Sequence, residues 1–159
     1  MSFVLDNSVA MCWLQNDGRP VDVAYALKVL DALKTTPAVV PNLWALEAAN
    51  VVAKAEAKGL VNEARTQAFV ATLTRLNITT DKATADHALG ETLNLARRYK
   101  LSAYDAAYLE LAMREALPLA TLDAAQQLRQ LGFRFVRPDF DVHGVHPENA
   151  YRPVYRLVV

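Results

Sequence analysis

The chain has 159 residues, of which 53% are hydrophobic and 21% charged, and its 17 basic and 17 acidic side chains give a net charge of zero. This length and composition predict one folded domain and exclude a disordered protein, which would combine low hydrophobicity with a high net charge. The single cysteine, Cys12, excludes an intrachain disulfide, and no apolar run approaches the ~20 residues of a membrane span, so we expect a cytoplasmic protein without a membrane partner.

Short apolar runs alternate with helical patterns along the chain. The first run, 3–5, ends at Asp6, and we expect a buried strand there, followed by a helix that Ser8 caps. The predicted strands are 3–5, 39–40, 77–80, 119–122 and 133–136. The predicted helices are 8–14, 21–34, 42–57, 61–76, 82–99, 102–117 and 123–131. This alternation indicates an α/β fold with a parallel sheet.

The last segment of the chain differs in character from the rest. Residues 143–149, HGVHPEN, are typical of a loop, and the residues after them could form an extended tail. We therefore expect a domain over residues 1–137 and a C-terminal extension or tail of unknown role over 138–159.

Four acidic residues stand out by position. Asp6 and Asp123 each follow a predicted strand, and functional groups in open parallel sheets gather beyond the carboxyl ends of the strands. Asp105 lies in the first turn of a predicted helix, and helix starts in this fold class face the same edge. Glu47 is flanked so closely by apolar residues that a fully solvent-facing position is hard to explain. We expect these carboxylates to gather in one crevice.

Each acid also has a purely structural interpretation. Asp105 and Asp123 would stabilise helix starts, where a carboxylate is worth ~0.3–1 kcal/mol against the helix dipole. Asp6 would cap the first helix, and Glu47 would pair with Lys54. Four clustered carboxylates repel one another, however, and need cations or raised pKa values. Mg²⁺, or else Mn²⁺, is the natural partner because oxygen ligands suit these cations.

Four segments resemble, in order, the sequence motifs of PIN domains. The four segments are FVLDNS at 3–8, PNLWALEAAN at 41–50, LSAYDAAYLELA at 101–112 and LATLD at 119–123. The resemblance covers about residues 2–137. Among PIN proteins of this size, the chain most resembles the VapC-type toxins of toxin–antitoxin pairs.

The resemblance implies a three-layer α/β/α PIN-like domain with a short central parallel sheet. It implies a metal-dependent endoribonuclease, the toxin of a type II toxin–antitoxin system, with RNA as substrate and a small antitoxin as partner. Similar proteins are usually homodimers. The implied catalytic residues and metal ligands are Asp6, Glu47, Asp105 and Asp123. Ser8 and Thr121 would be supporting groups that orient carboxylates or waters, with helix capping as the alternative.

Two other functions fit the same sequence. The chain could be a PIN nuclease that acts in RNA processing outside a toxin system, or an inactive PIN-like binding module whose acids only cap helices. Zero net charge argues against wholesale electrostatic binding of nucleic acid. If four carboxylates are occupied by metal, however, the basic side chains outnumber the remaining acids, so the neutral total does not exclude RNA.

The remaining polar and aromatic features are interpreted as structural. Tyr108 is expected to be a packing residue, and Asp81 an exposed acid on the helix 82–99. Arg97, Arg98 and Lys100 form the densest basic cluster. We expect this cluster to be a solvated helix end, with contact to an RNA backbone as the alternative.

Overall fold

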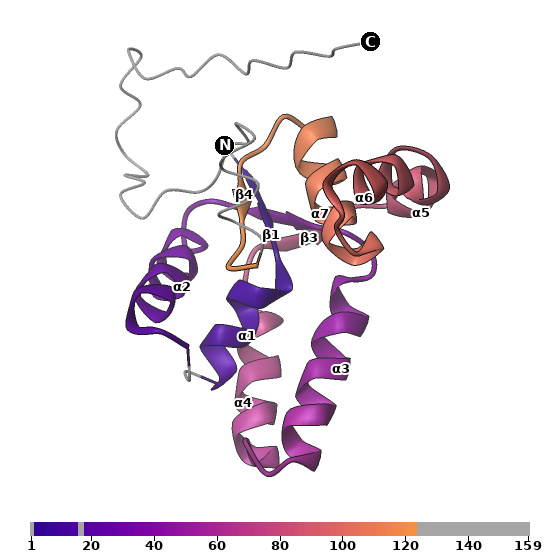
Figure 1. Ribbon diagram of the computed structural model, residues 1–159. Coiled ribbons are helices and arrows are strands. Elements are labelled where there is room, and N and C mark those ends of the chain that lie inside the picture. The colour runs from indigo at the N-terminus through magenta and orange to yellow at the C-terminus, as the bar shows by residue number, and fades with distance from the viewer. Residues whose placement is uncertain (1, 16–17, 124–159) are drawn as a thin grey trace.

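The computed structural model describes residues 2–15 and 18–123, which contain a four-stranded parallel sheet (Figure 1). The strands are β1 (Phe3–Leu5), β2 (Ala38–Val40), β3 (Ile78–Thr80) and β4 (Leu119–Ala120). Their order across the sheet is β3-β2-β1-β4, and Val4 of β1 pairs with Val39 on one side and Leu119 on the other. Because the strands are parallel, their carboxyl ends lie at one edge of the sheet.

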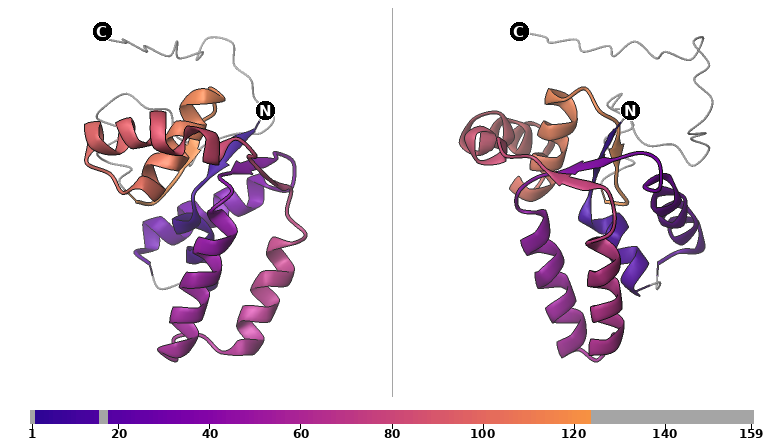
Figure 2. Two further views of the ribbon diagram at one scale, coloured as in Figure 1. Left: turned by 90° about the vertical axis from the view of Figure 1, so that its right-hand side faces the viewer. Right: turned by 180° about the vertical axis from the view of Figure 1, so that it is seen from behind.

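Helices on both sides of the sheet complete the expected α/β/α arrangement. The helices are α1 (Asn7–Gln15), α2 (Pro20–Ala32), α3 (Trp44–Ala57), α4 (Glu63–Leu73), α5 (Thr84–His87), α6 (Leu93–Tyr99) and α7 (Ala103–Arg114). In both views of Figure 2, α5, α6 and α7 lie on one side of the sheet, and α1, α3 and α4 on the other. The pair α3 and α4 extends beyond the sheet, and Gly59, with a φ of 68°, allows the left-handed turn that ends α3.

The hydrophobic core surrounds β1 and draws buried side chains from α1 and α7 among other elements. The largest fully buried apolar side chains include Phe3, Leu5, Leu14, Leu109 and Leu111. Cys12 is buried in the same core. Among the described residues, no helix is both long and apolar enough to cross a membrane.

The start of α1 differs from the sequence-based expectation. Ser8 does not precede the helix but lies inside its first turn. Asp6 precedes it instead, and its Oδ1 accepts a hydrogen bond from the Ser8 N–H at 3.4 Å. Asp6 therefore occupies the capping position, which suits a carboxylate next to the positive end of a helix.

The prediction of one continuous helix over 82–99 is wrong. The segment consists of α5, a π-helical turn at Ala88–Thr92 and α6. Its start is delayed because Asp81 accepts a hydrogen bond from the Ala83 N–H at 3.2 Å, which forms a turn ahead of the helix. The π-helical turn contains Gly90, a residue with low helix propensity.

The strand predicted over 119–122 is also too long. It ends at Ala120, because the Asp123 N–H donates to the Thr121 hydroxyl at 3.1 Å and turns the chain. The predicted helix 123–131 and strand 133–136, like the expected boundary between 137 and 138, lie outside the described residues.

Candidate active site

Asp6 is the most buried of the four acids, with 7% of its surface exposed. Its N–H continues the sheet by donating to the Ala120 carbonyl at 2.9 Å, which places it at the carboxyl end of β1. Its carboxylate accepts hydrogen bonds from the Ser8 hydroxyl, at 2.9 Å, and from the Thr121 hydroxyl. Burial raises the pKa of Asp6 to about 6, although both hydroxyl contacts lower it. The nearby Asp123 carboxylate raises this pKa further.

Ser8 and Thr121 connect the end of β1 to the end of β4. Besides donating to Asp6, the Ser8 hydroxyl accepts from the Leu122 N–H at 3.0 Å. The Thr121 hydroxyl likewise accepts from the Asp123 N–H at 3.1 Å. Each hydroxyl thus holds the Asp6 carboxylate and the chain leaving β4 at the same time.

Glu47 reaches the same region from the first turn of α3. The Tyr108 hydroxyl donates a hydrogen bond to its Oε2 from the middle of α7. Partial burial raises the pKa of Glu47, and the carboxylates of Asp105 and Asp123 raise it further. Burial and the bond to Glu47 raise the pKa of Tyr108, so the phenol keeps its proton and acts as the donor.

Asp105 and Asp123 lie on the more open side of the site. Ser102 precedes α7, and its hydroxyl both accepts from the Asp105 N–H at 3.0 Å and donates to the Asp105 carboxylate at 2.7 Å. This pair fixes the first turn of α7, as the sequence predicts. Partial burial raises the pKa of Asp123, and the Asp105 carboxylate adds to the rise.

The four carboxylates repel one another, and the described part of the chain places no compensating base beside them. Among the described residues, no basic side chain contributes to the pKa shifts of Asp6, Glu47 and Asp123. Asp81 provides a contrast, because it follows β3 as Asp6 follows β1 but pairs with Arg114 at 2.8 Å. Hydrogen bonds from Thr84, the backbone and Arg114 outweigh burial there and lower the pKa of Asp81.

The donor set fits a divalent cation such as Mg²⁺, because it consists of carboxylate oxygens with uncompensated charge. Within residues 2–15 and 18–123, however, no three His, Cys, Asp or Glu side chains converge closely enough to hold a metal ion. The structure therefore brings the four acids to one region of the sheet edge but does not close them around a single point.

The sequence from residue 3 to 133 matches the profile of the PIN domain family, and this match covers most of the chain. The chain belongs to the PIN domain family. PIN domains are generally nucleases. The matched range includes all four acids described above. Among curated proteins, no sequence relative was found.

Several solved structures resemble this PIN domain. VapBC2 from Rickettsia felis, bound to a DNA fragment from its promoter, has 17% identity and a TM-score of 0.60, over 86% of this chain and 98% of that one. A toxin–antitoxin complex from Klebsiella pneumoniae has 22% identity and a TM-score of 0.51, over 86% of this chain and 97% of that one. PAE2754 from Pyrobaculum aerophilum has 21% identity and a TM-score of 0.55, over 77% and 83%. At these identities the likeness shows the PIN fold alone.

Two polar contacts of the PIN domain were missed at the sequence level. Tyr108 is buried, as expected of a packing residue, but its hydroxyl also contacts Glu47. The available signal was its position three residues after Asp105, which places both side chains on one face of a helix. The expectation that Asp81 is an exposed helical acid was wrong, because Asp81 precedes α5 and is largely covered by its pairing with Arg114.

Proposed function

We propose that this PIN domain is a metal-dependent endoribonuclease toxin of a type II toxin–antitoxin system, which hydrolyses RNA phosphodiester bonds. The observation that carries the proposal is the set of carboxylates at the sheet edge, where burial and neighbouring carboxylates raise the pKa values of Asp6, Glu47 and Asp123 and no basic side chain of the described residues offsets the rise. Such a site favours a cation, and a cation among carboxylates is a known means of activating phosphodiesters. Membership of the PIN family and the fold shared with toxin–antitoxin complexes support the same function.

In this proposal the metal ligands are Asp6 and Asp105, joined directly or through waters by Glu47 and Asp123. The chemistry that a bound Mg²⁺ or Mn²⁺ supplies is activation of water and stabilisation of charge on phosphate oxygens. Ser8 and Thr121 hold the Asp6 carboxylate in place through their hydrogen bonds. Tyr108 does the same for Glu47. These contacts restrict the carboxylates before any cation arrives, which lowers the cost of ordering the site.

Hydrolysis with water as the nucleophile leaves a 5′-phosphate and a 3′-hydroxyl. The RNA 2′-hydroxyl is then not required, so the products differ from those of a nuclease that forms a cyclic phosphate. The proposed partners besides RNA are a small antitoxin protein and a second copy of this chain. The proposed location is the cytoplasm, where RNA and antitoxin are available.

The test is an RNA-cleavage assay with the full chain in Mg²⁺, in Mn²⁺ and in EDTA. We expect cleavage only with a divalent ion, and we expect Asp6→Asn and Asp105→Asn each to abolish it while the protein stays folded. Asp86→Asn is the matched control, because Asp86 is an exposed acid on α5 away from the four carboxylates. Equal cleavage by the Asp105→Asn protein would refute the role of that residue.

The alternatives predict different results in the same experiment. A PIN nuclease outside a toxin system would cleave in the same metal-dependent way but would not arrest growth when expressed, and no small protein from a neighbouring gene would neutralise it. An inactive binding module would cleave neither RNA nor DNA with either metal. We expect growth arrest by the parent chain, and none by the Asp6→Asn variant.

A further inference from the structure

The helix that carries Glu47 also carries two lysines in line with it. Lys54 and Lys58 follow Glu47 by seven and eleven residues in the helical segment formed by α3 and its cap. At about 100° per residue, both lysines lie within about 20° of the direction of Glu47 around the helix axis. With a rise of about 1.5 Å per residue, they lie ~10 and ~16 Å beyond Glu47 along the axis. The three residues form one stripe that begins at the carboxylate site.

The two lysines of the stripe are exposed, and they have no acidic partner among the described residues. Lys54 and Lys58 are both exposed, and neither takes part in an ion pair within residues 2–15 and 18–123. The other acid of α3, Glu56, is nine residues after Glu47, which places it on the opposite face of the helix. Positive charge is therefore confined to the face of α3 that continues from the site.

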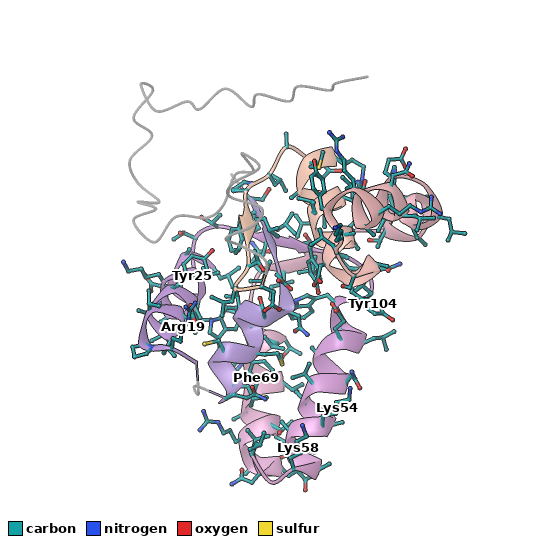
Figure 3. The ribbon with its side chains drawn as sticks, in the orientation of Figure 1. Arg19, Tyr25, Lys54, Lys58, Phe69 and Tyr104 are labelled. Carbon is teal, nitrogen blue, oxygen red and sulfur yellow. The ribbon has the colours of Figure 1, made fainter. Side chains whose placement is uncertain are left out.

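An exposed aromatic side chain lies near the Glu47 end of this stripe. Tyr104 is 60% exposed and directly precedes Asp105 in the first turn of α7. Figure 3 shows Tyr104 beside the sheet-side end of α3, and Lys54 and Lys58 farther along that helix toward its tip. Exposed aromatic rings next to basic grooves are typical of single-strand binding, where bases stack on the ring and cations contact the phosphates.

We propose that single-stranded RNA lies along α3, with phosphates on Lys54 and Lys58 and a base stacked on Tyr104, so that the chain between them crosses the carboxylates. These three residues are called the RNA track below. The proposal rests on the proposed function, since it assumes that the cleaved phosphate binds among the four acids. Even at the spacing of a duplex strand, about 3.4 Å per phosphate, the ~10 Å from Glu47 to Lys54 spans about three nucleotides.

An acidic protein segment is the competing occupant, and the geometry favours RNA over it. The RNA track leads to the region where the four carboxylates repel one another. These carboxylates would repel an acidic peptide as well. A polynucleotide would be attracted to that region once a cation is bound there, because its phosphate is the group that the cation would contact. The helix dipole alone also favours lysines near the end of α3, so the test needs a measurement that a dipole effect would leave unchanged.

The test is the salt dependence of RNA binding, measured by fluorescence anisotropy with a labelled single-stranded RNA and Mg²⁺. All proteins carry Asp105→Asn to prevent cleavage. We expect Lys54→Gln with Lys58→Gln to weaken binding and to reduce the slope of log affinity against log salt by about 1.4, because each lost single-strand phosphate contact removes about 0.7. The matched control is Lys28→Gln with Lys34→Gln, on and just after α2, which stands apart from α3 (Figure 1). The control should leave the slope unchanged.

Tyr104 is tested separately because its contribution is not electrostatic. We expect Tyr104→Leu to weaken binding about tenfold without changing the salt slope, and Tyr104→Phe to bind like the parent, because phenyl rings stack on bases as well. An unchanged salt slope in the double lysine variant would overturn the RNA track. So would unchanged RNA binding together with loss of binding to a co-expressed antitoxin, which would assign the lysines to the protein partner.

Failure of this inference can be told apart from failure of the proposed function. If the parent chain cleaves RNA with Mg²⁺ but the salt slope does not respond to the lysines, only the RNA track is wrong. If the parent chain cleaves no RNA under any condition, the proposed function itself is wrong.

Discussion

The hydroxyl of Thr121 donates a hydrogen bond to the carboxylate of Asp6, which joins the ends of β4 and β1 although the two residues are 115 positions apart in the chain. The same hydroxyl accepts the N–H of Asp123 at 3.1 Å. One small side chain thus fixes the most buried acid of the site and the backbone of a second acid. Removing it should loosen both without disturbing the hydrophobic core.

Thr121→Val tests this contact, because valine has nearly the same shape but no hydroxyl. We expect the variant to fold and to bind Mg²⁺ or Mn²⁺ about 10–100-fold more weakly, which is the usual effect of losing a group that orients a metal ligand. Thr121→Ser keeps the donor and should bind within a few-fold of the parent. Metal titration by calorimetry measures both variants, and equal affinity of the valine variant and the parent would show that the hydroxyl serves the fold only.

Tyr108→Phe tests the corresponding contact to Glu47. The ring stays buried, so we expect the free energy of unfolding to change by only about 1 kcal/mol, the net worth of one hydrogen bond. The Glu47 carboxylate, however, loses the hydroxyl donor that α7 supplies, and the cleavage rate should fall about tenfold or more. Cleavage kinetics and urea unfolding are measured on the same preparations. Full activity of the Tyr108→Phe protein would show that the Tyr108 hydroxyl does not position Glu47 for cleavage.

The sequence predicted the position of Asp6 well because the information is local. An apolar run that ends in an acid defines both a buried strand and the residue at its carboxyl end, and β1 ends one residue before Asp6. The same holds for Asp105, because Ser102 and the helical pattern after it define the first turn of α7. Local patterns of this kind also gave the parallel α/β architecture.

Contacts between distant elements could not be predicted in this way. The bond from Tyr108 to Glu47 joins residues 61 positions apart and depends on how α7 packs beside the start of α3. The pairing of Asp81 with Arg114 likewise depends on where the end of α7 lies relative to β3. In both cases the residue type was compatible with several partners, and only the packing of the helices selects one.

Arg114→Met tests the energetic role of that packing. Arg114 pairs with Glu110 at 2.8 Å and with Asp81 at 2.8 Å, and only 4% of Glu110 is exposed. Removing one partner of a buried ion pair is strongly destabilising, because the remaining charge is then neither paired nor solvated. We therefore expect the free energy of unfolding to fall by about 3 kcal/mol. The double variant Arg114→Met with Glu110→Gln should recover part of this loss. Urea unfolding of the parent and the two variants measures these differences. An Arg114→Met protein as stable as the parent would contradict the view that Glu110 is left as an uncompensated buried charge.

The stability that Asp81 provides should depend on pH. Its pKa is lowered below the usual 3.8, because hydrogen bonds from Thr84, the Ala83 N–H and Arg114 outweigh burial. A carboxylate of this kind contributes stability that is fully present above its unfolded-state pKa and is lost as the pH falls through the folded-state pKa. We expect Asp81→Asn to lower the unfolding free energy by about 1–2 kcal/mol at neutral pH, with the difference shrinking below about pH 4. Asp86→Asn, at an exposed acid of α5, is the matched control for the substitution itself. A constant difference between Asp81→Asn and the parent across this range would mean that the asparagine disturbs packing and that the ion pair with Arg114 contributes nothing.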